Sequence, residues 1–229
     1  MIKAVAFDLD NTLIDFVRFK EETAKAAANA LVANGLGAKP NEVKKKIWEV
    51  YDKHGVEYQK TFATLLGDHY KIRDPNKFER LQQAAINAYL ARKLEVLRPY
   101  PSVKPTLRAL RKKGCLLCIV TDAPRNKAWQ RLLLCGLQDS FDFVITKDDT
   151  NRAKPSTLPF RALLKKTGLM PKQVLFVGDD PKKDIMGAKK VGMLTALAEY
   201  GWVLHRNSRI KPDFYLKRPS GILQILRQA

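Results

Sequence analysis

The chain has 229 residues, of which 45% are hydrophobic and 28% charged, a balance that excludes wholesale disorder and suits one or two domains with a buried core. No apolar run approaches the roughly 20 residues that a membrane helix requires, so we expect a cytoplasmic protein with no membrane partner. The formal net charge of +19 favours anionic ligands, which include phosphorylated metabolites, nucleic acid and acidic surfaces.

Short apolar runs alternate with helical patterns over most of the chain. The apolar runs predict buried strands over residues 2–7, 116–120, 143–145, 174–177 and 194–198. The helical patterns lie over residues 103–113, 125–135, 157–167 and 184–191, and a glycine follows each of them, as is common at helix C-termini. This alternation predicts an α/β fold, with a Rossmann-like parallel sheet in a three-layer α/β/α core.

The segment from about residue 16 to residue 97 contains no strand pattern. Its apolar residues recur instead at helical spacing over 21–33, 41–51 and 77–97. We therefore predict an α-helical domain over residues 16–95, inserted into a core domain of residues 1–15 and 96–229 that ends in a strand and a helix after residue 206. Charge is unevenly divided: residues 15–95 hold 15 basic and 11 acidic side chains, and the rest of the chain holds 27 and 12.

Three cysteines are present, and an odd number favours reduced thiols over a disulfide framework. Cys115 and Cys118 form a C-x-x-C pattern, which can indicate a metal or redox site. The pattern lies, however, in an apolar run without a second cysteine pair or a histidine cluster. We predict that both residues are buried core thiols.

Two carboxylates follow the first predicted strand. Asp8 and Asp10 are two residues apart, and residues i and i+2 of an extended chain point to the same side. Close carboxylates repel each other unless a cation lies between them, and Mg²⁺ prefers oxygen ligands. The pair therefore indicates a magnesium site, although two aspartates at a strand end can also be ordinary loop or capping residues.

Three further clusters follow later strands, at the edge where open α/β sheets bind ligands. The clusters are Thr121-Asp122, Lys154-Pro155 and Gly178-Asp179-Asp180 with Asp184. Each cluster alone has an ordinary interpretation as a helix cap, a solvated lysine or a turn. Their agreement at one edge of the sheet is the stronger observation, and it predicts a single site.

Taken in chain order, these motifs resemble those of the haloacid dehalogenase superfamily of hydrolases, and in particular a phosphatase-type member with a helical cap of the C1 type. The motifs are Asp8-Leu-Asp-Asn-Thr-Leu13, Thr121 after an apolar strand, Lys154-Pro155, and Gly178-Asp179 with Asp184. The resemblance covers essentially the whole chain, with the helical insertion between the first and second motifs. It implies that the helical domain closes over a small cavity.

The resemblance also implies roles for the motif residues. Asp8 would be the nucleophile that forms an aspartyl-phosphate, and Asp10 would be the general acid/base. The phosphoryl group would be bound by Thr121, Asp122 and Lys154. Mg²⁺ would be held by Asp8, the backbone carbonyl of Asp10 and Asp179, with Asp180 and Asp184 behind these ligands.

Asp10 and Asp179 favour phosphoryl transfer over dehalogenation, because the resemblance implies that dehalogenases of this superfamily lack the second carboxylate and do not depend on Mg²⁺. The expected activity is Mg²⁺-dependent hydrolysis of a small soluble phosphomonoester of the sugar-, triose- or glycolate-phosphate type. A 2-haloacid dehalogenase and a phosphomutase are the alternatives within the superfamily. Phe16, Arg18 and Lys20 follow the first motif and could either face the substrate or pack at the surface.

The alternative from a different class is a protein that binds nucleic acid or another polyanion on the same scaffold, which the basic core domain favours. All four motifs are intact, however, and no pattern of aromatic and basic residues for base stacking is present. We therefore expect a small phosphorylated metabolite as the partner rather than nucleic acid.

Overall fold

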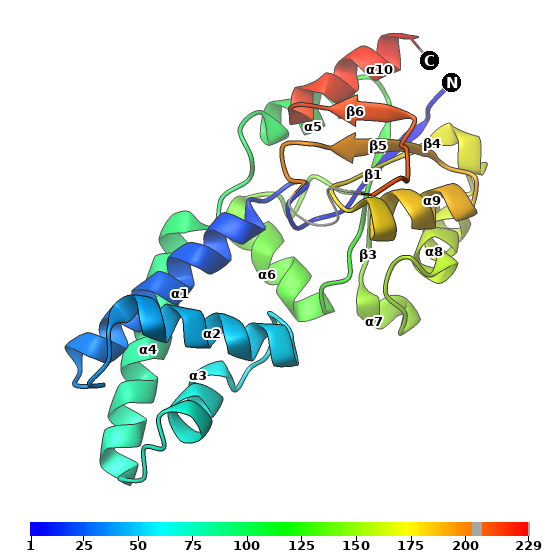
Figure 1. Ribbon diagram of the computed structural model, residues 1–229. Coiled ribbons are helices and arrows are strands. Elements are labelled where there is room, and N and C mark those ends of the chain that lie inside the picture. The colour runs from blue at the N-terminus through cyan, green and yellow to red at the C-terminus, as the bar shows by residue number, and fades with distance from the viewer. Residues whose placement is uncertain (203–207, 229) are drawn as a thin grey trace. The chain divides into compact units, whose positions relative to one another are not determined.

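A computed structural model of the protein describes residues 1–202 and 208–228 (Figure 1). At its centre is a sheet of six parallel strands in the order β3-β2-β1-β4-β5-β6. The strands are β1 (Ala4–Phe7), β2 (Leu116–Val120), β3 (Phe143–Ile145), β4 (Val174–Gly178), β5 (Leu194–Ala198) and β6 (Phe214–Leu216). The predicted α/β class and its strands are confirmed, the last strand included. Residues 206, 207 and 229 of the predicted tail lie outside the described residues.

Helices lie around this sheet (Figure 1). Those of the core are α5 (Val103–Lys112), α6 (Arg125–Cys135), α7 (Lys147–Thr150), α8 (Thr157–Thr167), α9 (Met186–Lys190) and α10 (Ile222–Gln228). On one face α8 and α9 pack against the strands, and Phe160 and Leu163 join Cys118 and Phe176 in a buried apolar cluster. Alternate strand residues such as Ile119 are equally buried and point to the other face, where α5 contacts β2. Burial on both faces explains why the strands appear in the sequence as continuous apolar runs.

The helix predicted over residues 184–191 begins earlier than predicted. A π-helical turn, Pro181–Ile185, precedes α9. The Asp180 side chain accepts hydrogen bonds from the backbone N–H groups of Lys182 and Lys183 at 2.8 and 3.3 Å, which caps the start of this turn. A proline at the first helical position is also favourable, because its missing N–H would have no partner there.

Two smaller predictions are confirmed. Gly136 and Gly168 end α6 and α8 with φ angles of +60° and +66°, a conformation that glycine adopts without steric cost. Cys115 and Cys118 are buried free thiols, and burial raises the pKa of the Cys118 thiol to about 12. Within the described part of the chain, no helix combines the length and the apolar composition needed to cross a membrane.

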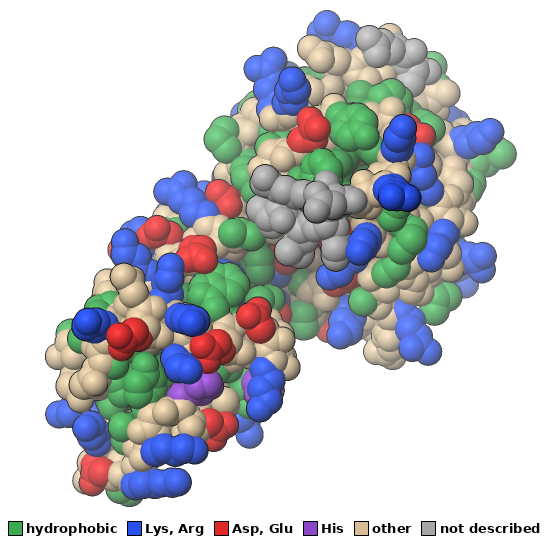
Figure 2. Space-filling model, viewed as in Figure 1, with side chains coloured by type: hydrophobic (Ala, Val, Ile, Leu, Met, Phe, Trp, Pro, Cys, Tyr) green, Lys and Arg blue, Asp and Glu red, His purple; other side chains and the backbone are tan. Residues whose placement is uncertain are grey.

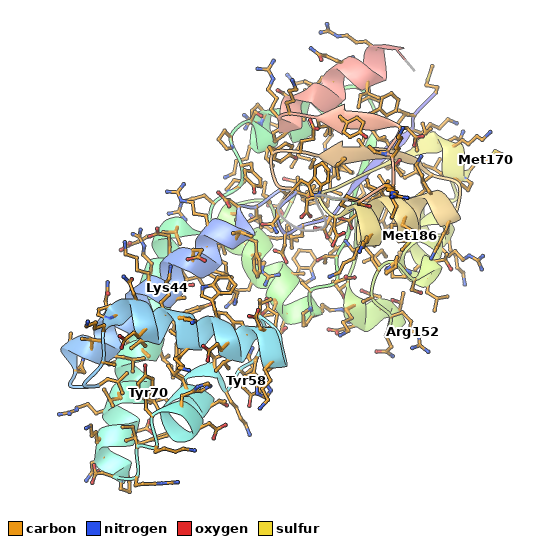
Figure 3. All side chains as sticks on the ribbon, viewed as in Figure 1. Lys44, Tyr58, Tyr70, Arg152, Met170 and Met186 are labelled. Carbon is orange, nitrogen blue, oxygen red and sulfur yellow. The ribbon has the colours of Figure 1, made fainter. Side chains whose placement is uncertain are left out.

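Residues 17–96 form a compact unit of their own, separate from the unit of residues 1–16 and 97–229. The elements of this segment are α1 (Phe16–Ala33), α2 (Pro40–His54), α3 (Thr61–Thr64), a π-helical turn (Leu65–His69) and α4 (Pro75–Val96). Its apolar core includes Ala28, Ile47 and Leu81. Lys44, labelled in Figure 3, extends from α2 and pairs with Glu21 of α1 at 3.0 Å. The helical turns over 61–69 were not predicted, because segments of four and five residues are too short to show a helical period.

Candidate active site

Strand register brings the motifs that follow β1, β2 and β4 to one edge of the sheet. Phe7 of β1 pairs with Ile119 of β2 on one side and with Val177 of β4 on the other. The residues that follow, Asp8 and Thr121 among them, therefore emerge together at the carboxyl ends of the strands. The backbone N–H of Asp8 donates to the Val177 carbonyl at 2.8 Å, which holds the start of the first motif against β4.

The Lys154 ammonium group lies at the centre of the site, with only 3% of its side chain exposed. Its Nζ is 2.5 Å from Asp8 Oδ1 and 2.6 Å from Asp184 Oδ1, and it donates to the Val120 carbonyl at 3.2 Å. Burial by itself would lower the pKa of this lysine, but the negative charges of Asp184, Asp8 and Asp122 outweigh burial and raise the pKa. Lys154 is therefore a fixed positive charge beside Asp8.

Asp122 supports this lysine through its side chain. Its Oδ1 accepts a hydrogen bond from the backbone N–H of Lys154 at 2.9 Å. That Asp122 helps to bind phosphate stays a prediction. The side chain holds the segment that carries Lys154, and a phosphate contact from Asp122 would have to come from its backbone N–H.

Three buried carboxylates converge at the site. Asp8, Asp179 and Asp184 each offer an oxygen atom, and these atoms all lie within 4.8 Å of one another. The Thr12 hydroxyl donates to Asp179 Oδ1 at 3.4 Å. The close approach of Asp184 requires glycine at position 178, because a Cβ on Gly178 would lie 2.4 Å from Asp184. The group contains two predicted metal ligands, Asp8 and Asp179, and adds Asp184, which the prediction placed behind them.

Burial and mutual repulsion raise the pKa values of these carboxyl groups. Burial is the largest cause for Asp8, whose pKa rises to about 8 although Lys154 acts in the opposite direction. Burial, followed by the charges of Asp184 and Asp8, raises the pKa of Asp179 to about 9. The pKa of Asp184 is raised as well, again mainly by burial. A hard divalent cation would favour the ionised form of all three groups, and their oxygen atoms are the donors that such a cation prefers.

The Asp10 carboxylate is not part of this acidic group. Its Oδ2 forms an ion pair with Nη1 of Arg131 at 2.6 Å. The resemblance assigns Asp10 a metal contact through its backbone carbonyl and a proton-transfer role through its side chain. Pairing of the side chain with Arg131 leaves both assignments possible, since neither requires the carboxylate to join the other three.

Two remaining predicted residues make local contacts. Thr121 is 3% exposed, and its Oγ1 accepts a hydrogen bond from the Ala123 N–H at 3.1 Å. A hydroxyl that accepts in this way can still donate its own proton to a ligand. The backbone N–H of Asp180 donates to Asp184 Oδ2 at 3.0 Å, so Asp180 positions Asp184.

Several residues of the site were not predicted, among them Thr12, Tyr200 and Arg131. The Tyr200 hydroxyl donates to the Thr12 carbonyl at 2.8 Å, which connects the loop after β5 to the first motif. The same approach requires Gly201, where a Cβ would lie 1.5 Å from the Asn11 carbonyl oxygen. Thr12 could have been singled out as part of the first motif, whereas no local pattern marks Arg131 among 42 basic residues.

The excess positive charge is dispersed on the face of the molecule seen in Figure 2. Lysine and arginine side chains alternate there with acidic, polar and apolar ones over both units. Among the described residues on this face, they do not form the continuous basic stripe that is typical of a nucleic-acid interface.

Comparison with known proteins gives consistent results. The chain matches the family model of haloacid dehalogenase-like hydrolases over residues 2–192. It is 33% identical over 233 residues to a glyceraldehyde 3-phosphate phosphatase of Methanopyrus kandleri, with 100% of this chain and 98% of that protein covered. It is 31% identical over 226 residues to a phosphoglycolate phosphatase of Aquifex aeolicus, with 98% and 97% covered. A solved HAD phosphatase of Thermococcus onnurineus has a TM-score of 0.70 and 28% identity over 98% of both chains.

Proposed function

Since the chain belongs to the haloacid dehalogenase-like hydrolases, we propose that it hydrolyses a small phosphomonoester by way of an aspartyl-phosphate on Asp8. The observation that carries this proposal is the buried Asp8–Lys154–Asp184 arrangement at the carboxyl end of β1. It places a nucleophile and a fixed positive charge in contact, as attack on an anionic phosphoryl group requires. The relatives named as phosphatases of glyceraldehyde 3-phosphate and phosphoglycolate support small substrates of this class.

The reaction proceeds in two displacements. A carboxylate oxygen of Asp8 bonds to phosphorus while the bond from phosphorus to the ester oxygen breaks, and Asp10 protonates the departing oxygen. Asp10 then takes a proton from water, whose oxygen bonds to phosphorus as the bond to Asp8 breaks. The products are an alcohol and inorganic phosphate, and Asp8 is regenerated. Lys154 and Thr121 hold the phosphoryl oxygens during both displacements.

The donor set also supports a requirement for Mg²⁺. Asp8, Asp179 and the backbone carbonyl of Asp10 would hold the ion, with Asp184 beside them. When bound, it would offset the negative charge of the carboxylates and of the incoming phosphate. This charge argument favours phosphate ester hydrolysis over dehalogenation, because a departing halide needs neither a proton from Asp10 nor a compensating cation.

We assign the helical unit of residues 17–96 the role of the cap domain that restricts access to small substrates. Its insertion directly after the first motif supports this assignment, as does its own apolar core, which lets it act as a separate body. Arg18 of α1 is the exposed candidate for contact with the substrate, whereas Lys20 is buried and donates to the Val56 carbonyl at 2.6 Å within the helical unit.

The proposal is tested by hydrolysis of p-nitrophenyl phosphate with Mg²⁺ and with EDTA, followed by a panel that includes glyceraldehyde 3-phosphate and phosphoglycolate. We expect Mg²⁺-dependent release of phosphate and faster turnover of one or more small metabolites than of the aryl ester. Retention on nucleic acid that decreases with salt, with no turnover of any phosphoester in the panel, would contradict the proposal and favour polyanion binding.

We also expect stabilisation by Mg²⁺ to increase with pH. The raised pKa values of Asp8, about 8, and of Asp179, about 9, mean that these groups retain protons to higher pH in the metal-free folded protein than in the unfolded chain. Mg²⁺ must displace those protons, so its affinity rises as the pH increases from about 6 to about 9. The increase in melting temperature that Mg²⁺ causes should therefore become larger over the same range.

Without the metal, in EDTA, we expect stability to fall as the pH rises. A carboxyl group whose folded-state pKa is raised stabilises the protein below its unfolded pKa, and that stability is lost as the pH rises through about 8 to 9.

Melting temperatures measured with and without Mg²⁺ across this pH range check the prediction. Asp179→Asn should abolish the stabilisation by Mg²⁺. Asp139→Asn is the matched control, because Asp139 is an exposed carboxylate bonded to Gln138 at 2.9 Å. An equal effect of Mg²⁺ on both variants would contradict the metal assignment.

A further inference from the structure

Arg131 occupies an unusual position for an arginine. The buried residues of α6 are Ala128, Arg131, Leu132 and Cys135, so the guanidinium group lies within the apolar stripe of an amphipathic helix. Only 4% of its side chain is exposed. A charge in such a place is unfavourable unless it is compensated, and Asp10 Oδ2 lies 2.6 Å from its Nη1.

A second contact restricts the orientation of this guanidinium. The ring of Phe16 lies with its centroid 4.4 Å from the guanidinium carbon of Arg131, a cation–π arrangement that favours a flat stack. The planar group is thus held between an aromatic ring and a carboxylate. These two contacts limit the movement of the guanidinium group, and a lysine could reproduce its charge but not its planar shape.

We propose that Arg131 is a positioning residue for proton transfer by Asp10. The inference rests on the proposed phosphatase function. Arg131 holds Oδ2, so Oδ1 is the oxygen that carries the proton to the ester oxygen as the bond from that oxygen to phosphorus breaks. The carboxylate that remains is paired with Arg131, and Oδ1 accepts a proton from water in the second displacement. The arginine therefore acts through Asp10 and touches neither the substrate nor the phosphoryl group.

The dependence of the rate on the leaving group separates this role from a purely structural one. An alkyl phosphate needs a proton on its departing oxygen, whereas p-nitrophenolate is a stabilised anion and leaves without one. We expect Arg131→Met to slow the first displacement, measured as release of the alcohol in a single turnover, by about 10- to 100-fold for an alkyl phosphate of the metabolite panel. For p-nitrophenyl phosphate we expect a much smaller fall in this single-turnover rate, because only the second displacement then depends on Asp10, and little change in KM for either substrate.

Two further variants connect the effect to Asp10. Asp10→Asn should show the same selectivity for the leaving group, and adding Arg131→Met to it should lower the rate little further, because the two residues act as a unit. Arg131→Lys should restore part of the alkyl phosphate activity. Arg111→Met is the matched control, since Arg111 also pairs with a carboxylate, that of Asp142 at 3.0 Å, and should leave the ratio of the two rates unchanged.

The outcomes are distinguishable. If Arg131→Met lowers both rates by the same factor while Asp10→Asn is selective, Arg131 is structural and the inference is wrong. If the methionine variant does not fold, the ratio of rates in Arg131→Lys decides in the same way. If the native protein with Mg²⁺ hydrolyses neither ester, the proposed phosphatase function fails rather than the role of Arg131 within it.

Discussion

Replacing Asp8 with asparagine is expected to lower phosphomonoester hydrolysis by on the order of 10⁴-fold or more. The amide has nearly the same shape as the carboxylate, but its oxygen is a poor nucleophile and cannot form the aspartyl-phosphate. The substitution removes one of three converging carboxyl groups and leaves Asp184 to pair with Lys154 at 2.6 Å. We therefore expect Asp8→Asn to remain folded, so that the loss of rate reports chemistry.

Trapping of the intermediate gives this prediction a second readout. Native protein mixed with phosphate-labelled substrate and quenched in acid should carry label that hydroxylamine releases, as an acyl phosphate does. Asp8→Asn should carry none, and Asp139→Asn should behave as the native protein does, because Asp139 is exposed and distant in sequence from every motif. Turnover by Asp8→Asn close to the native rate would exclude Asp8 as the nucleophile.

Sequence patterns were sufficient to predict the parallel sheet because its strands are buried on both faces and therefore form apolar runs. The helices between the strands could be predicted because a glycine follows each of their helical patterns. Residues such as Cys118 and Ile119 point to opposite faces and are both fully buried, which makes β2 an unbroken apolar run. Element boundaries were less predictable. The turn Pro181–Ile185 begins before the predicted helix because the Asp180 side chain caps it, and a capping aspartate has the same signature as an acidic site residue.

The site could be predicted only where its residues belong to a short motif. Asp8, Asp179 and Asp184 were found because they follow strands whose ends meet. Arg131 was not, because a contact between α6 and the first motif depends on packing rather than on spacing. The contact of Asp122 was not predictable either, since its position indicates a ligand contact but not that its carboxylate accepts a hydrogen bond from the backbone of Lys154.

Replacing Lys154 with methionine is expected to affect both stability and rate. Removing one partner of a buried ion pair costs about 3–5 kcal/mol, because the remaining carboxylates lose their counter-charge. Here the carboxylates are those of Asp8 and Asp184, which lie 2.5 and 2.6 Å from the lysine Nζ. The loss of a positive charge beside the phosphoryl group should also lower kcat/KM by about 10²- to 10³-fold, the effect of losing one preorganised donor.

The size of the stability loss should depend on pH with a definite sign. The pKa of Asp8 is raised to about 8 even with Lys154 present, and it rises further without the lysine. A carboxyl group whose folded-state pKa is raised stabilises the protein below its unfolded pKa and loses that contribution as the pH rises through the folded-state value. Urea unfolding in EDTA should therefore show a small difference between Lys154→Met and native protein near about pH 5, and the full difference near about pH 9.

Two comparisons identify the cause of this pH dependence. Lys189→Met removes an exposed lysine that pairs with Asp213 at 3.2 Å, and such a surface pair contributes at most about 1 kcal/mol with little dependence on pH. Adding Asp8→Asn to Lys154→Met should recover part of the lost stability at high pH, because one of the two uncompensated charges is then absent. If the double variant is as unstable as the sum of the two single changes, the ammonium group contributes packing rather than charge, and the electrostatic account of the site is wrong.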